Sequence, residues 1–186
     1  ENKEFIDNKK FFPADFIAEG VDQTRGWFYT LHAISSMVFG SVSYKNVISN
    51  GLVLDKEGQK MSKRLGNAVD PFKTLSDFGP DATRWYMISN SNPWDNLKFD
   101  LNGVEEVKRK FFGTLYNTYS FFALYANIDK FKFAEKEIDF IKRPELDRWI
   151  ISELNSLILK VDNYYNDYEP TKAARAISSF VIDNLS

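Results

Sequence analysis

The run ADFIAEG at residues 14–20 and the run VISNGLVL at residues 47–54 are short, apolar and partly β-branched, which is typical of buried strands. Apolar residues between them recur at spacings of 4, 3 and 4, which predicts a helix over residues 22–39. These residues are Trp27, Leu31, Ile34 and Val38. Asp22 is placed to cap this helix and Gly40 to end it. Strand, helix and strand in this order predict a βαβ unit with a parallel sheet.

Two short helices and a weak strand are predicted after this unit. Asp70 and Pro71 open a helix over residues 71–78, because Asp is a favoured cap and Pro suits the first turn. The tripeptide GPD opens a second helix over residues 80–88. The sequence LKFDL at residues 97–101 has a weak strand pattern.

The rest of the chain is helical in pattern apart from one linker. Apolar residues step by 3 or 4 over residues 104–125 and again over residues 146–161, and Pro170 opens a third helix, which predicts an αα-hairpin. The polar, lysine-rich residues 127–144 separate the first two patterns. The fold class is therefore α/β followed by all-α. We expect four parts, at residues 1–70, 71–128, 129–143 and 144–186.

Composition excludes several classes of site. The chain has 186 residues, no cysteine and one histidine, so a disulfide framework, a thiolate zinc site and any site with two imidazoles are excluded, and no metal ligands are predicted. Its 24 basic and 26 acidic residues give it no overall attraction to nucleic acid. No apolar run is long enough to cross a membrane. The first residues do not resemble a signal peptide, so we expect a cytoplasmic protein and interpret the chain as an internal piece of a longer one.

The loop that follows the second predicted strand is basic. The sequence QKMSKRLGN at residues 59–67 places three cations within five residues, and residues 55–66 sum to a charge of +2. In open α/β sheets ligands bind beyond the carboxyl ends of the strands, so these cations are placed to reach a polyphosphate. A solvated basic turn is the alternative for any loop of this composition.

Two motifs carry a family resemblance. Residues 60–64, KMSKR, followed by LGN and by Asp70-Pro71, resemble the second signature motif of class I aminoacyl-tRNA synthetases, which usually ends in Ser where this chain has Arg64. Residues 19–28, EGVDQTRGWF, are similar to the corresponding stretch of the isoleucyl-tRNA synthetase family. The resemblance extends over essentially all 186 residues. It implies the C-terminal half of a Rossmann-like parallel nucleotide-binding sheet at residues 1–70, a stem-contact region at 71–128, a linker at 129–143, and the start of an anticodon-binding helical bundle at 144–186.

The resemblance also implies roles for individual residues. Lys60 and Lys63 match the catalytic lysines, and Trp27 matches a wall of the pocket for the amino-acid side chain. The positions that match ATP or adenylate contacts are Glu19, Gly20, Asp22, Gln23, Asn50, Val53, Met61 and Ser62. Many bacterial members have His where this chain has Asn50, and this difference, like Arg64, resembles the eukaryote-like branch. The alternatives are that Asp22 is only a helix cap and that Trp27 belongs to the core.

The implied activity is the ATP-dependent activation of isoleucine and its transfer to tRNA(Ile). The implied partners are isoleucine, tRNA(Ile), ATP and the Mg²⁺ that accompanies ATP, with no membrane, and we expect a monomeric parent whose isolated piece is free to self-associate. The family also needs a His-x-Gly-His motif, which one histidine cannot supply, so we expect the 186 residues alone to be inactive.

Two other functions are compatible with the sequence. The first is a non-catalytic tRNA-binding helical module, for which aromatic residues cluster at Tyr116, Tyr119, Phe121, Phe122 and Tyr125, although helical spacing more often indicates core. The second is an unrelated helical interaction domain with a basic loop that binds no nucleotide.

Overall fold

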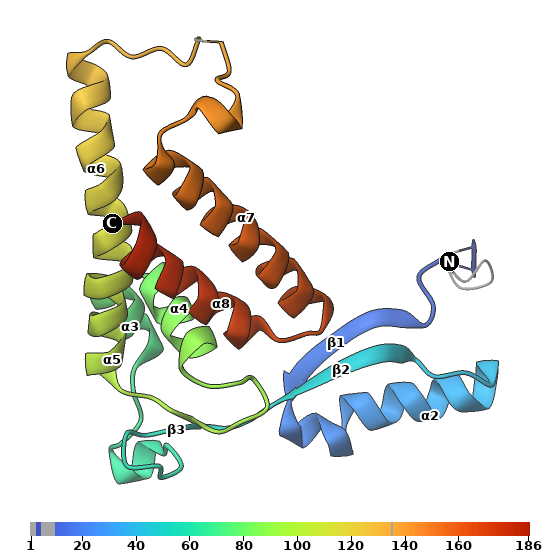
Figure 1. Cartoon of the computed structure of the whole chain (residues 1–186). Helices are drawn as coiled ribbons and strands as arrows, with labels where there is room; N and C mark the ends of the chain where they lie inside the picture. Colours follow the sequence, from blue (N-terminus) through green and yellow to red (C-terminus); the bar gives the residue numbers. More distant parts are fainter. Residues whose placement is uncertain (1–2, 5–9, 135) are drawn as a thin grey trace. The chain divides into compact units, whose positions relative to one another are not determined.

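The computed structural model describes residues 3–4, 10–134 and 136–186, which divide into two compact units (Figure 1). The strand unit comprises Glu1–Asn67 and Pro93–Lys98, and the helical unit comprises Ala68–Asn92 and Phe99–Ser186. The strand unit is therefore discontinuous in sequence. The four-part division expected from the sequence stays a prediction.

The predicted βαβ unit is confirmed in the strand unit. Strands β1 (Ala14–Gly20) and β2 (Tyr44–Asn50) pair in parallel, and α2 (Trp27–Phe39) connects them. The sheet and the helix bury Ile17, Ile48 and Phe28. The α2 helix ends at Gly40, as expected, and the Gly40 N–H donates to the Ser36 carbonyl.

The predicted start of α2 is wrong. Residues Val21–Arg25 form a 3₁₀ turn, η1, and the α-helix begins at Trp27. Asp22 lies inside this turn and does not cap α2. The Gln23 side chain satisfies the first helical amide instead, because its Oε1 accepts from the Trp27 N–H at 2.8 Å.

The predicted strand over residues 47–54 is two strands in two sheets. The β2 strand ends at Asn50, and β3 (Val53–Leu54) pairs in parallel with β4 (Leu97–Lys98). The break lies at Gly51, whose N–H donates to the Pro93 carbonyl at 2.8 Å. A Cβ at Gly51 would lie 2.2 Å from the Asp95 carbonyl oxygen, so only glycine allows this approach.

The first part of the helical unit follows the predictions closely. It contains α3 (Pro71–Phe78) and α4 (Pro80–Asn90), and Asp70 caps α3 by accepting from the Phe72 and Lys73 amides. The weak strand expected at residues 97–101 covers only β4, because Asp100 caps the next helix. That helix continues through α5 (Leu101–Val107), a π-helical turn η3 (Lys108–Phe112) and α6 (Gly113–Ile128).

The predicted αα-hairpin is confirmed. It consists of α7 (Glu145–Asn166) and α8 (Pro170–Ser179), followed by a π-helical turn η5 (Phe180–Leu185) (Figure 1). Between α6 and α7 the described residues form one short 3₁₀ turn, η4 (Phe140–Lys142). Phe111, Phe180 and Val181 form a buried cluster, and the Trp85 ring stacks on Phe111 at a centroid distance of 4.5 Å. Arg175 of α8 donates to the Ser89 and Asn90 carbonyls, so α8 satisfies the carboxyl end of α4.

Candidate functional site

The carboxyl ends of β1 and β2 meet at one edge of their sheet. Glu19 lies opposite Ser49 and Gly20 lies opposite Asn50 in the parallel register. The structure therefore brings together Glu19, Gly20 and Asn50, three of the residues expected at the site. This edge of a parallel sheet is where α/β folds bind their ligands.

The η1 turn continues from this edge and holds the next two expected residues. The Gln23 amide donates to Asp22 Oδ2 at 3.2 Å while its Oε1 accepts from Trp27, so one side chain joins the turn to α2. A Cβ at Gly20 would lie 2.8 Å from Asp22 Oδ1, which places the Asp22 carboxylate directly over Gly20. The η1 turn therefore places the polar side chains of Asp22 and Gln23 beside Gly20, the last residue of β1.

Trp27 is not a core residue. Its side chain is 47% exposed, and its ring lies 6.2 Å from that of the buried Phe28. The alternative interpretation of Trp27 as core is therefore wrong, and an apolar surface next to η1 is open to a ligand.

The basic loop, which we define as residues 55–67, follows β3 in the chain. It begins with a turn that returns Lys60 to an antiparallel bridge with Leu54, and it ends with a short 3₁₀ turn, η2 (Lys63–Leu65), capped by the Ser62 hydroxyl. Lys60 and Lys63 are exposed, and within the described part of the chain neither forms an ion pair. Met61 and Ser62 are half-buried between them. Two ammonium groups are therefore free to meet an anion.

Two polar residues that sequence reasoning missed close the basic loop. Asn67 donates to Asp55 Oδ2 at 2.8 Å and accepts from the Ser62 N–H at 2.8 Å, although 12 residues separate it from Asp55. The Asn67 amide, followed by the amides of Gln59, Glu57 and Gly58, lowers the pKa of the Asp55 carboxyl below its ordinary value of 3.8. The only sequence signal for this pair is an Asp and an Asn at the two ends of a charged loop.

Other titratable groups do not join this site. His32 is exposed, and its ring lies 6.2 Å from that of Tyr44. Glu106 forms an ion pair with Lys110, which lowers the pKa of the Glu106 carboxyl. Over residues 3–4, 10–134 and 136–186, no three carboxylates or imidazoles come close enough to hold a metal ion. In the same residues no helix combines the length and the apolar character that crossing a membrane requires.

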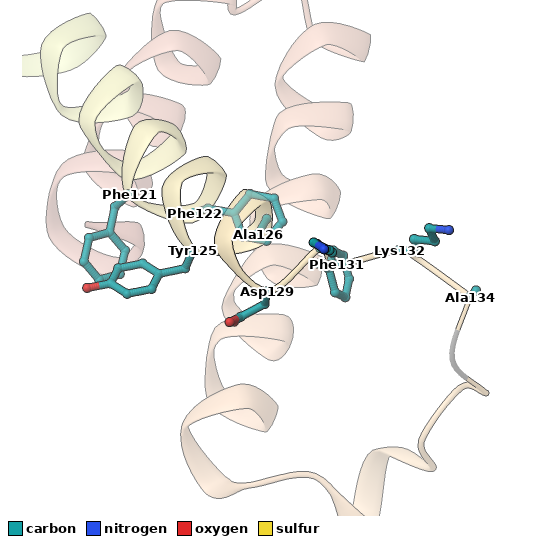
Figure 2. Close-up of a pocket in the computed structure, with 9 residues that line it drawn as sticks. Phe121, Phe122, Tyr125, Ala126, Asp129, Phe131, Lys132 and Ala134 are labelled. Carbon is teal, nitrogen blue, oxygen red and sulfur yellow. The ribbon is translucent and has the colours of Figure 1, made fainter.

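A separate cavity of about 950 Å³ lies at the end of α6 in the helical unit (Figure 2). The rings of Phe121 and Tyr125 pack together there at 4.9 Å, and Phe131 packs edge-on to Phe122 at 6.1 Å. None of the five aromatic residues at positions 116–125 is buried, so their interpretation as core is wrong.

Comparisons with known proteins give a family. Residues 1–100 match the model of the class I tRNA synthetases (I, L, M and V), and residues 147–186 match the anticodon-binding domain of tRNA ligases. The isoleucine–tRNA ligase of Bacteroides fragilis is 71% identical over all 186 residues, and that of Thermus thermophilus is 48% identical over 178 residues, which is 96% of this chain. The chain spans 16% and 17% of their lengths, about one sixth.

A solved structure shows the same fold. Methionyl-tRNA synthetase of Mycobacterium tuberculosis, in complex with methionyl-adenylate, matches 97% of this chain and 35% of its own with a TM-score of 0.75 at 20% identity. Both predicted architectures, the parallel strands of a class I catalytic domain and the helices of an anticodon-binding region, are confirmed. A family match over more than half of the sequence, on a fold that has the expected parallel strands and basic loop, means that this chain belongs to the class I tRNA synthetases.

Proposed function

We propose that this chain supplies part of the active site of an isoleucine–tRNA ligase, which uses ATP to activate isoleucine and transfers it to tRNA(Ile). In the activation step, a carboxylate oxygen of isoleucine bonds to the α-phosphorus of ATP, and the bond from that phosphorus to the departing pyrophosphate breaks. The observation that carries the proposal is the basic loop after β3, in which Lys60 and Lys63 are exposed and unpaired within the described residues.

The two lysines are assigned to the phosphates. Negative charge moves onto the pyrophosphate as the bond breaks, so ammonium groups that meet it stabilise the transition state more than the ground state. The Mg²⁺ that accompanies ATP belongs to the substrate in this proposal, because no described group of residues is arranged to hold a metal ion.

The edge residues are assigned to the adenylate. Glu19 is an acceptor for the α-ammonium of isoleucine or a ribose hydroxyl, and Gly20 lets the adenylate approach the backbone. Asp22 and Gln23 add polar contacts from η1. Asn50 and Val53 are assigned to adenine and ribose, through a side chain and the backbone respectively. Trp27, exposed beside η1, forms a wall for the isoleucine side chain.

Met61 and Ser62 are assigned to ATP, with one condition for Ser62. In this structure the Ser62 N–H donates to Asn67 and its hydroxyl accepts from the Arg64 N–H at 3.2 Å. A contact between Ser62 and ATP therefore requires one of these bonds to open or the free lone pairs of the hydroxyl to be used.

The test is isoleucine-dependent ATP–pyrophosphate exchange by a full-length synthetase that carries this sequence. Lys60→Ala and Lys63→Ala should each lower the rate by about 10²-fold, with a smaller change in isoleucine affinity. Lys56→Ala is the matched control, because Lys56 is an exposed cation of the same loop that pairs with Glu57. Equal loss in ground-state binding with no loss in rate, or an equal loss in Lys56→Ala, would contradict the assignment.

A tRNA-binding module without catalysis is the second candidate. The anticodon-binding match at residues 147–186 favours it, and so do exposed aromatic rings near Lys130 and Lys132 at the end of α6. Affinity for tRNA(Ile) that falls steeply with salt, unchanged by ATP and by Lys60→Ala, together with no exchange activity in the full-length protein, would select this candidate. Protein synthesis takes place in the cytoplasm, so we propose a cytoplasmic location for either function. We also propose that the full-length protein is a monomer.

A further inference from the structure

The basic loop is closed by a single side chain. Asn67 donates to Asp55 Oδ2 at 2.8 Å and to the Lys60 carbonyl at 3.3 Å, and it accepts from the Ser62 N–H at 2.8 Å. One amide therefore bonds the first residue of the loop and the residues on both sides of Met61. We call these three hydrogen bonds, from the Asn67 side chain to Asp55, Lys60 and Ser62, the clasp.

Asp55 organises the other half of the loop. Its Oδ1 accepts from the Glu57 N–H at 3.1 Å and from the Gln59 N–H at 2.7 Å. Its own N–H donates to the Gln59 carbonyl at 2.9 Å, and its carbonyl accepts from the Gly58 N–H at 2.9 Å. Residues 55–59 are therefore a closed turn, and the carboxylate at its base uses one oxygen for the turn and the other for Asn67.

We infer that Asp55 and Asn67 are positioning residues that hold the basic loop in the conformation in which Lys60 and Lys63 receive the phosphates of ATP. This inference rests on the proposed function of the two lysines. Lysine side chains are long and flexible, so the backbone decides which volume their ammonium groups can reach. The clasp fixes that backbone at the Lys60 carbonyl and at Ser62, which caps the η2 turn that starts at Lys63.

The clasp requires different chemistry at its two ends. Position 55 needs two acceptor oxygens, and position 67 needs a donor and an acceptor on one side chain. A carboxylate at position 67 would face the Asp55 carboxylate. An amide at position 55 has only one acceptor oxygen, so its amino group would either face the Asn67 amino group or replace the oxygen that accepts from the Glu57 and Gln59 N–H groups. Exchange of the two residues, with Asn at 55 and Asp at 67, restores the bond between the side chains and the bond to Ser62. It replaces the bond to the Lys60 carbonyl by a contact between two acceptor oxygens, so the rescue is expected to be incomplete.

This exchange gives a rescue experiment on a full-length synthetase that carries the sequence. The variants are Asp55→Asn, Asn67→Asp and the double variant. Two readouts are taken: the kcat and the KM for ATP in pyrophosphate exchange, and the rate of tryptic cleavage after Lys60, Lys63 and Arg64 relative to cleavage after Lys132. Gln59→Ala is the matched control, because Gln59 lies in the same loop and bonds to Asp55 through its backbone alone, which the substitution keeps.

Asn67→Asp should lower kcat by about tenfold and raise the relative tryptic cleavage by a similar factor, because it loses two hydrogen bonds and places two carboxylates together. Asp55→Asn should have a smaller effect in the same direction. The KM for ATP should change by less than about threefold in both, since the lysines act mainly on the transition state. The double variant should return to within about threefold of the wild type in both readouts, and Gln59→Ala should match the wild type.

A double variant that is no better than Asn67→Asp, in cleavage and in kcat, overturns the inference. So does Asn67→Asp with wild-type cleavage and kcat when Lys60→Ala still lowers the exchange rate by about 10²-fold, and that result leaves the proposed function intact. Rescue of tryptic protection without any effect of Lys60→Ala on exchange has the opposite meaning: the clasp orders the loop, but the proposed role of the lysines is wrong.

Discussion

Alanine at position 51 tests how the two sheets of the strand unit are joined. The added Cβ would lie 2.2 Å from the Asp95 carbonyl oxygen and 2.5 Å from its carbon, and both atoms belong to the backbone. A Cβ needs at least 3.0 Å, so the segment at residues 93–97 must move by about 0.8 Å. No side-chain rotation can relieve this contact.

That movement acts on three hydrogen bonds. They join Gly51 N–H to the Pro93 carbonyl at 2.8 Å, Leu52 N–H to Asn96 Oδ1 at 2.8 Å, and Leu97 N–H to the Leu52 carbonyl at 2.9 Å. Their loss costs about 3 kcal/mol at roughly 1 kcal/mol each. The lower entropy of the unfolded chain with alanine returns about 0.4–1 kcal/mol, so we expect a net loss of about 2 kcal/mol.

Hydrogen–deuterium exchange measures this loss locally. In Gly51→Ala, the amides of Leu52 and Leu97 should exchange about 30-fold faster, which corresponds to about 2 kcal/mol. Gly113→Ala is the matched control, because its Cβ would lie 3.5 Å from the Lys108 carbonyl oxygen, an ordinary van der Waals distance, and its backbone is helical. That variant should gain about 0.5–1 kcal/mol in free energy of unfolding. Unchanged exchange at Leu52 and Leu97 in Gly51→Ala would refute the steric reasoning.

Three further predictions concern the site. Trp27→Ala in the full-length enzyme should raise the KM for isoleucine by about tenfold and leave the KM for ATP nearly unchanged, because the proposed role of the exposed indole is to form a wall for the isoleucine side chain; equal damage to both would show a general structural role. The 186 residues alone should show no isoleucine-dependent ATP–pyrophosphate exchange. A single histidine cannot supply the expected His-x-Gly-His motif in the other half of the nucleotide site, so the lowering of the activation barrier by fixed positioning of the reactants, up to about 7–11 kcal/mol, is missing. Exchange above a Lys60→Ala control would contradict this. The carboxyl of Asp55 should titrate below pH 3.8, followed by carbon-13 NMR, and Asn67→Ala should raise this pKa. Because the pKa of Asp55 is lower in the folded protein than in the unfolded chain, the ionised carboxylate stabilises the fold fully above pH 3.8. This stabilisation is lost as the pH falls through the pKa of the folded protein. A titration midpoint at or above pH 3.8 in the wild type would be the contrary result.

Local patterns in the sequence predicted the parts of the fold that local interactions determine. The cap at Asp70 and the end of α2 at Gly40 each depend on residues within four positions of one another, and the helices of the αα-hairpin each follow the local periodicity of their own residues. The prediction that Asp22 caps α2 is wrong, also for a local reason. The Gln23 side chain is long enough to bond the Trp27 amide four residues ahead, so the helix begins at Trp27 and not directly after Asp22.

Interactions between distant residues were not predictable in this way. The pairing of β3 with β4 depends on a close approach of two backbones, and a glycine at position 51 does not say which segment approaches it. The family motif predicted Lys60 and Lys63 but not the clasp, because Asp55 and Asn67 form a polar network with no periodicity. The motif therefore predicted the two cations of the loop, and it gave no sign of the bonds that hold the loop backbone.

The discontinuity of the strand unit has a consequence for synthesis on the ribosome. The bond partners Leu52 and Asn96 are 44 residues apart, so at 5–20 residues per second the nascent chain spends roughly 2–9 s between making β3 and making its partner. During that interval β4, the described strand that pairs with β3, has not yet been made, and an unpaired strand edge is prone to bind other chains. Slow codons within residues 55–92 should therefore increase aggregation of the newly made protein, whereas slow codons after residue 98 should not.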